Sequence, residues 1–87
     1  MNAFQSQAEL LKYLVDMFPF GITKADKVFA WLRSNTIEHS TLTNGVIYAS
    51  IGVRKFFFFK KKLLMQFHFG TKQELTDIKV SESYTGL

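Results

Sequence analysis

The sequence predicts an α+β domain in which two N-terminal helices pack on one face of an antiparallel β-meander of about four strands. Two observations favour this class. Apolar residues recur at every third or fourth position up to Asn35, and at every second position from Val46 onward. Helices followed by consecutive strands are typical of an α+β fold. The 87 residues have room for one hydrophobic core, so we expect 1–87 to form a single domain.

The first helix is expected at about 6–18. Ser6 and Glu9 stand three positions apart, as in a capping box, where each side chain binds the free backbone N–H group of the other residue. Pro19 and Gly21 follow, and they predict that the chain turns after the helix. The apolar positions with helical spacing are Leu10, Leu11, Leu14, Val15 and Phe18.

The second helix is expected at about 23–34. Thr23 is the predicted N-cap, because its hydroxyl can accept a hydrogen bond from a free backbone N–H group of the first turn. Asp26 suits the positive end of the helix dipole, and Arg33 suits the negative end. The buried stripe of this helix is expected to consist of Val28, Trp31 and Leu32.

The four strands are expected at about 46–51, 54–59, 63–69 and 75–81. Before the first strand, the Asn44-Gly45 pair predicts a hairpin turn, because both turn positions need a positive φ. The lysines at 60–62 are expected to form the turn between the second and third strands. Another turn is expected at 70–72. The core face of the third strand is expected to hold Leu63, Met65, Phe67 and Phe69.

Four consecutive phenylalanines, 56–59, end the second expected strand. Because neighbouring residues of a strand face opposite sides, only two of these rings can share the helix-covered core. Phe57 and Phe59 are expected on the open side, beside Tyr48 and Leu64. An apolar patch of this kind predicts an interface with another protein or with a second copy of the chain. Alternatively, a loop or the C-terminal tail covers the rings, or a bulge changes their register.

The net charge of +4 is concentrated in one segment. Residues 54–62 carry five positive charges, whereas the other six basic and seven acidic residues sum to −1. Basic residues next to aromatic rings predict a second function, the binding of nucleic acid or of acidic lipid headgroups. The alternative is a solvated turn that keeps a hydrophobic hairpin in solution. The candidate anion-binding residues are Arg54, Lys55, Lys60, Lys61 and Lys62.

The sequence contains no arrangement of residues that is typical of an active site or a metal centre. Cysteine is absent, and the five glycines form no phosphate-binding loop. His68 could titrate or bind a ligand, but a single histidine between two strand phenylalanines is more typical of a packing or surface position. We therefore expect a binding module and not an enzyme, without cofactor or metal. The absence of a leader peptide, a lipid-attachment cysteine and a membrane span predicts a cytoplasmic protein.

Two stretches of the chain are similar to motifs of a known family. The stretch GITKADKVFAWL (21–32) is similar to a helix motif G-[MI]-T-x-x-x-V-x-x-x-L, with Val28 one position late and Leu32 four positions after it. The stretch LLMQFHFGTKQELTDIKV (63–80) is similar to two strands of the same family, which end with the motif L-T-x-I. The family is that of the SmpA/OmlA (BamE-like) outer-membrane lipoproteins, with the wider group of domains resembling the β-lactamase inhibitory protein. The resemblance covers about 20–80 and implies this fold and non-enzymatic protein binding.

The founding members of that family have a leader and a lipidated cysteine, which this chain lacks, so the resemblance does not imply membrane anchoring or barrel assembly. A second resemblance involves TLTNGVIYAS (41–50) and LTDIKVSESYTGL (75–87). Both stretches are similar to strands of bacterial pleckstrin-homology-like domains. Such a domain implies further strands and a closing helix, for which 87 residues leave no room.

Overall fold

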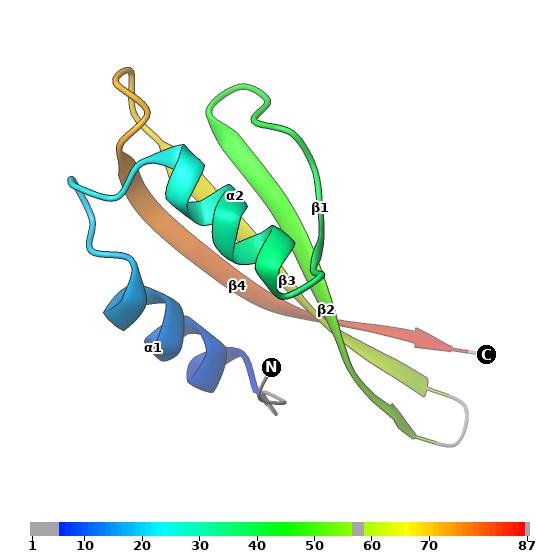
Figure 1. The fold of residues 1–87 in the computed structure, drawn as a ribbon. Helices are drawn as coiled ribbons and strands as arrows, with labels where there is room; N and C mark the ends of the chain where they lie inside the picture. Colours follow the sequence, from blue (N-terminus) through cyan, green and yellow to red (C-terminus); the bar gives the residue numbers. More distant parts are fainter. Residues whose placement is uncertain (1–5, 57–58, 87) are drawn as a thin grey trace.

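The structure, a computed structural model, describes residues 6–56 and 59–86, and for 53–56, 59 and 85–86 it describes the backbone alone. Two helices precede four strands along this part of the chain (Figure 1). The elements are α1 (Gln7–Met17), α2 (Ala25–Ser34), β1 (Glu38–His39), β2 (Val46–Phe56), β3 (Phe59–Phe69) and β4 (Leu75–Gly86). Each helix begins and ends within two residues of its predicted bounds.

The four strands form one antiparallel sheet in the order β1-β2-β3-β4, so strands that follow each other in the chain are paired. This arrangement confirms the predicted α+β class and the antiparallel meander. Both helices lie on the same side of the sheet (Figure 1). We call the other side of the sheet the open face.

The strand bounds correct the prediction in the middle of the chain. The strands expected at 46–51 and 54–59 form one continuous strand, β2, which ends at Phe56. The turn expected at 60–62 is wrong, because all three lysines lie inside β3. A β-bulge between Gly52 and Arg54 shifts the register of β2 without ending the strand. Residues 57–58, which join β2 to β3, lie outside the described residues.

One edge of the sheet is formed by β1, which the sequence did not predict because two residues are too few to show an alternation. β1 pairs with Ala49 and Ser50 of β2. Between the two strands, Asn44 and Gly45 have φ angles of 52° and 77°, and the flanking residues exchange two backbone hydrogen bonds of 3.0 Å. The hairpin turn predicted at Asn44-Gly45 is therefore confirmed.

The start of α1 is held by two hydrogen bonds to its free backbone N–H groups. The Oγ atom of Ser6 accepts from the N–H of Glu9 at 3.3 Å, which is one of the two bonds of the predicted capping box. The Oε2 atom of Glu82, in β4, accepts from the N–H of Gln7 at 3.3 Å. The helix dipole favours a carboxylate at this end, so the hydrogen bond from Gln7 to Glu82 stabilises the contact between α1 and β4.

The prediction that Thr23 caps α2 is wrong. The N-cap residue is Lys24, which makes no side-chain capping bond. Thr23 is 3% exposed, and its hydroxyl donates to the backbone carbonyl of Pro19 at 2.8 Å. At this buried position the hydroxyl satisfies a carbonyl of the turn between the helices. The backbone carbonyl of Thr23 also accepts from the N–H of Leu75, at the start of β4.

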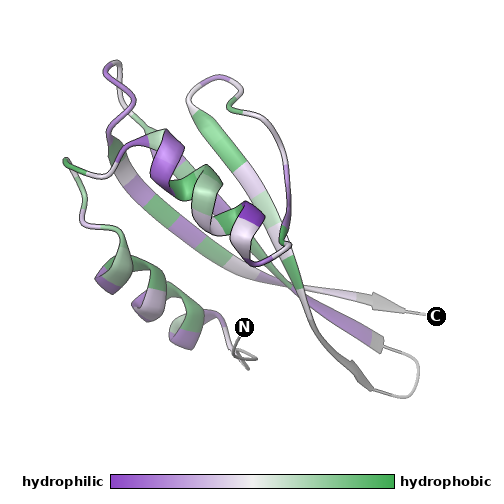
Figure 2. Ribbon diagram, viewed as in Figure 1, coloured by the Kyte–Doolittle hydropathy of each residue, from purple (hydrophilic) through white to green (hydrophobic). Residues whose placement is uncertain are grey.

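One hydrophobic core fills the space between the helices and the sheet. Phe18, at the end of α1, packs edge-on against Phe67 of β3, with ring centroids 6.2 Å apart, and against Trp31 of α2 at 5.8 Å. The predicted core face of β3 is confirmed, because its four apolar residues are buried. Figure 2 shows the matching alternation of apolar and polar residues along β4. In α1, by contrast, Val15 is 39% exposed and lies outside the core.

Candidate functional site

The far ends of β2, β3 and β4 extend beyond the helices (Figure 1). We call this extension the basic arm, and it consists of 52–56 of β2, 59–62 of β3 and 83–86 of β4, which the strand register places side by side. The basic arm contains all five residues of the predicted anion-binding segment and none of the seven acidic residues of the chain. Its formal charge is therefore +5.

The register of β2 and β3 concentrates this charge further. Arg54 lies opposite Lys61, and Lys55 lies opposite Lys60. Like charges at directly opposite positions of an antiparallel pair are destabilising. The register places basic residues opposite each other at two successive pairs of positions.

Lys61 differs from its neighbours because it has an acidic partner on the helix side of the sheet. Its Nζ atom lies 3.4 Å from Oε2 of Glu82, and its side chain is 15% exposed. The hydroxyl of Tyr84 donates to Oε1 of the same carboxylate at 2.7 Å. The pKa of Glu82 is lowered, first by the hydrogen bond from Tyr84 and then by the backbone N–H of Gln7. This cluster links the basic arm to the start of α1.

The open face carries the side chains that alternate with those of the core. These are Val46, Tyr48 and Ser50 of β2, Lys60, Lys62, Leu64, Gln66 and His68 of β3, and Asp77, Lys79, Ser81 and Ser83 of β4. The three lysines among them are exposed. Tyr48 is 51% exposed and Leu64 is 38% exposed, and they are diagonal neighbours because Tyr48 lies opposite Gln66. The open face is thus a mostly polar surface around a small apolar centre.

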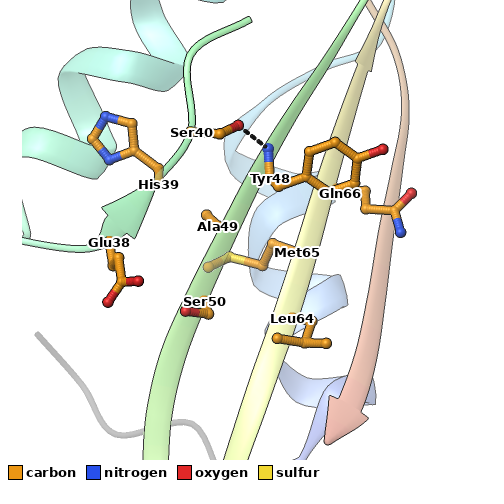
Figure 3. Close-up of a pocket in the computed structure, with 9 residues that line it drawn as sticks. All are labelled: Glu38, His39, Ser40, Tyr48, Ala49, Ser50, Leu64, Met65 and Gln66. Atoms are coloured by element: carbon orange, nitrogen blue, oxygen red, sulfur yellow. Dashed lines mark hydrogen bonds between the residues drawn. The ribbon is translucent and has the colours of Figure 1, made fainter. Parts of the chain in front are cut away.

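A hollow of about 400 Å³ opens between β1, β2 and β3 (Figure 3). Ala49 and Met65 have their side chains in the core, so the groups that can meet a ligand come from the other lining residues. Tyr48 and Leu64 supply apolar surface, and Glu38 and Gln66 supply polar atoms. The lining residues are Glu38, His39, Ser40, Tyr48, Ala49, Ser50, Leu64, Met65 and Gln66.

Tyr48 stands on a backbone that is fixed from both sides. The N–H of Tyr48 donates to Oγ of Ser40 at 3.0 Å, drawn as a dashed line in Figure 3. In return, the carbonyl of Tyr48 accepts from the N–H of Ser40 at 2.8 Å. On its other side Tyr48 is paired with Gln66 of β3. An exposed aromatic ring on such a constrained strand loses little conformational entropy when it binds a partner.

The two histidines have structural partners. The Nδ1 atom of His39 lies 2.7 Å from the carbonyl of Ile37 and must donate to it, since a carbonyl oxygen only accepts. The His39 ring lies 5.8 Å from the ring of Phe29 and, in Figure 3, points away from the hollow. His68 is half-buried on the open face, with Nε2 at 3.1 Å from Oε1 of Gln66. Neither contact is the nucleophile-and-base pair that covalent catalysis needs.

The structure brings together part of the predicted protein interface. Tyr48 and Leu64 both line the hollow on the open face. Phe57 lies outside the described residues. The expectation that Phe59 lies beside Tyr48 and Leu64 is wrong, because Phe59 begins β3, seven positions from the residue opposite Tyr48.

Several residues of the site could not be found from the sequence. Glu38 and Ser40 precede the start of β2 by eight and six positions and reach the hollow only because β1 folds back along that strand. The sequence does contain a signal for the polar residues of the open face. In β3, Gln66 follows Leu64 after two positions, so the alternation of the strand places both on the same side.

The described residues hold neither a metal site nor a helix that could span a membrane. They contain no group of three or more histidine and carboxylate side chains that could hold a metal ion. Neither α1 nor α2, the helices of this part of the chain, is long and apolar enough to cross a membrane. Comparisons with protein-family models, curated proteins and solved structures found no match.

Proposed function

We propose that the protein is a non-enzymatic binding module whose basic arm holds a phosphate-bearing polyanion. The observation that carries this proposal is the register of β2 and β3, which gathers five basic residues on one extension of the sheet. Lys60 and Lys62 are exposed there. The chemistry required is that of closely spaced phosphates, whether on a nucleic acid or on an acidic lipid surface.

The position of the acidic residues supports this function. Glu82 pairs with Lys61 on the helix side, so the charge that a partner meets on the open face lies with the exposed Lys60 and Lys62. The basic arm extends beyond the helices, so a polyanion can approach it without contacting them (Figure 1).

The test compares binding of the wild-type chain and of Lys60→Ala/Lys62→Ala at several salt concentrations. Fluorescence anisotropy measures binding to single-stranded and duplex oligonucleotides, and co-sedimentation measures binding to phosphatidylserine vesicles. We expect the double variant to bind at least about tenfold more weakly at low salt. Its salt slope should fall by about 1.4 for a single strand, since each phosphate contact contributes about 0.7.

The matched control is Lys12→Ala/Lys27→Ala, which removes the same charge from exposed positions of α1 and α2. Equal losses of affinity in the two double variants would show that net charge matters and the basic arm does not. Binding that is independent of salt would also contradict the proposal. Binding to vesicles but not to oligonucleotides would assign the phosphates to lipid.

A second candidate function is protein binding through the open face. The partner would be another protein or a second copy of the chain. Tyr48 and Leu64 are exposed at its centre, and the outer edge of β4 has no partner strand among the described residues. If the chain self-associates, its mass in sedimentation equilibrium rises with concentration. Leu64→Glu should then lower that mass, whereas Val15→Glu, on the helix side, should not. A constant monomer mass would exclude self-association.

A further inference from the structure

We propose that the open face binds a single-stranded nucleic acid, with one unpaired base stacked on Tyr48 in the hollow and the phosphate backbone running along β3 to Lys62 and Lys60. This inference rests on the proposed function, because it uses the basic arm for the phosphates. It adds a class of partner and a second contact. Three features of the open face carry it: the charge layout, the aromatic ring and the polar lining of the hollow.

On β3 the lysines of the open face lie away from the hollow, and a third lysine, Lys79 of β4, lies opposite Gln66. Lys62 stands four positions from Gln66, the residue opposite Tyr48, which is about 13 Å along the strand at about 3.3 Å per residue. Lys60 lies two positions further into the basic arm. Glu38 stands at the rim of the hollow and would repel a phosphate there. A nucleotide chain therefore fits with its phosphates at the lysines and a base, which carries no charge, in the hollow.

The ring of Tyr48 has the properties of a stacking platform. It is 51% exposed, and its backbone is fixed on one side by Ser40 and on the other by Gln66. Every base has a flat π-face, so stacking on one tyrosine needs no particular sequence, but it does need a base that is unpaired. The hollow of about 400 Å³ beside the ring has room for one.

The polar atoms around the ring match the edges of a base. Gln66 offers its amide donor, since its Oε1 atom already contacts Nε2 of His68, and Ser50 offers a hydroxyl. The carboxylate of Glu38 can accept from the amino group of cytosine, and adenine has a similar amino donor. Leu64 adds apolar surface next to Tyr48. Base edges need such a mixture of hydrogen-bonding and apolar groups.

The other occupants fit this surface less well. A lipid bilayer would bury the hydroxyls of Ser50 and Ser81 in an apolar medium, which is costly. A second copy, docked by the same face, would add three more lysines to an interface that already contains Lys60, Lys62 and Lys79. A single strand supplies both negative charge and unpaired bases.

The test measures the affinity of Tyr48→Ala and Tyr48→Phe for a 12-nucleotide DNA strand, and for the duplex of the same sequence. Loss of the ring should weaken single-strand binding between about fivefold and about 150-fold, the equivalent of about 1–3 kcal/mol for one stacked base. Tyr48→Phe should stay within about twofold of wild type because it keeps the π-face. The salt slope should be unchanged, since no phosphate contact is lost.

Three further measurements make the result specific. Tyr13→Ala removes an exposed ring from α1, on the other side of the sheet, and should leave affinity unchanged. Photo-crosslinking to an oligonucleotide that contains 5-iodouracil should give an adduct at Tyr48, located by mass spectrometry. Circular dichroism of Tyr48→Ala should match that of wild type, because the side chain lies outside the core.

Failure of this inference and failure of the proposed function give different results. If Tyr48→Ala binds like wild type while Lys60→Ala/Lys62→Ala does not, the basic arm binds a polyanion but the open face binds no base. The inference is also overturned if duplex and single strand bind equally and both lose affinity in Tyr48→Ala. A mass that falls on Tyr48→Ala without oligonucleotide would assign the face to a second copy. If no polyanion binds, both proposals fail.

Discussion

The helix-covered part of the sheet and the basic arm are built on the same strands, yet they are stabilised differently. Along one side of β3, Leu63, Met65 and Phe67 are at most 1% exposed and pack in the core. The next position on that side, towards the basic arm, is Lys61, which is paired with Glu82. The residue type changes where the helix cover ends. Burial in the core therefore requires apolar residues in the covered part. The basic arm lies beyond the helices and can carry charged residues (Figure 1).

The largest expected effect is on the free energy of unfolding, and it distinguishes the core side of β3 from its open-face side. Phe67→Ala should lower the free energy of unfolding by about 3–5 kcal/mol, because it opens a cavity against Phe18. That is a large fraction of the about 5–15 kcal/mol typical of whole domains. Leu64→Ala, on the open face of the same strand, should cost less than about 1 kcal/mol. Urea unfolding measures both, and equal losses would contradict the assigned faces.

The next effect compares one glycine at the covered end with one in the basic arm. Gly45 has φ 77°, and an added Cβ atom would lie 3.2 Å from the carbonyl oxygen of Phe69. Gly45→Ala should therefore cost about 1–2 kcal/mol. Gly52 has open space around its Cβ position, so Gly52→Ala should change stability by less than about 0.5 kcal/mol. Thermal melts of the two variants measure the difference, and similar melting temperatures would contradict it.

A smaller effect of opposite sign is expected in the basic arm. Lys60→Glu should raise the free energy of unfolding by roughly 0.2–1 kcal/mol, because it places opposite charges at the paired positions 55 and 60. The same variant should weaken oligonucleotide binding. Lys12→Glu, on α1, serves as the control for net charge. Suppose that Lys60→Glu lowered the free energy of unfolding and left the affinity for the oligonucleotide intact. That result would contradict the view that the basic residues of the arm weaken folding and serve binding.

The smallest effect concerns the cluster that links the two parts. Because the folded-state pKa of Glu82 is lowered, its ionised form contributes stability above its unfolded pKa, near 4.5, and this contribution is lost as the pH falls through the folded value. Glu82→Gln should therefore be slightly less stable than wild type at neutral pH, and the difference should disappear in acid. Tyr84→Phe removes the largest cause of the shift, so NMR titration should show the pKa of Glu82 returning towards 4.5.

Local signals predicted much of the fold. The spacing of apolar residues located both helices, the alternation located the core face of β3, and Asn44-Gly45 located its turn. The error at 60–62 has a physical cause. Three lysines in sequence are polar enough to predict a turn, but beyond the helices a strand needs no apolar side, so the same residues form part of β3.

The candidate site was less predictable than the fold. Alternation alone indicated that Tyr48 and Leu64 face away from the helices, and their exposure agrees with this. The pairing of Arg54 with Lys61 depends on the bulge at Gly52, which no pattern in the sequence indicates. Glu38 reaches the hollow through the pairing of β1 with β2, a tertiary contact that has no local signal.

We propose that the basic arm and the open face bind a nucleic acid, whereas the helices stabilise the sheet. An NMR titration of the ¹⁵N-labelled chain with a 12-nucleotide DNA strand measures both parts at once. We expect amide shift changes at Lys60, Lys62 and Tyr48, with little change in α1 and α2. Shift changes concentrated in the helices, or none at concentrations where anisotropy detects binding, would contradict the proposal.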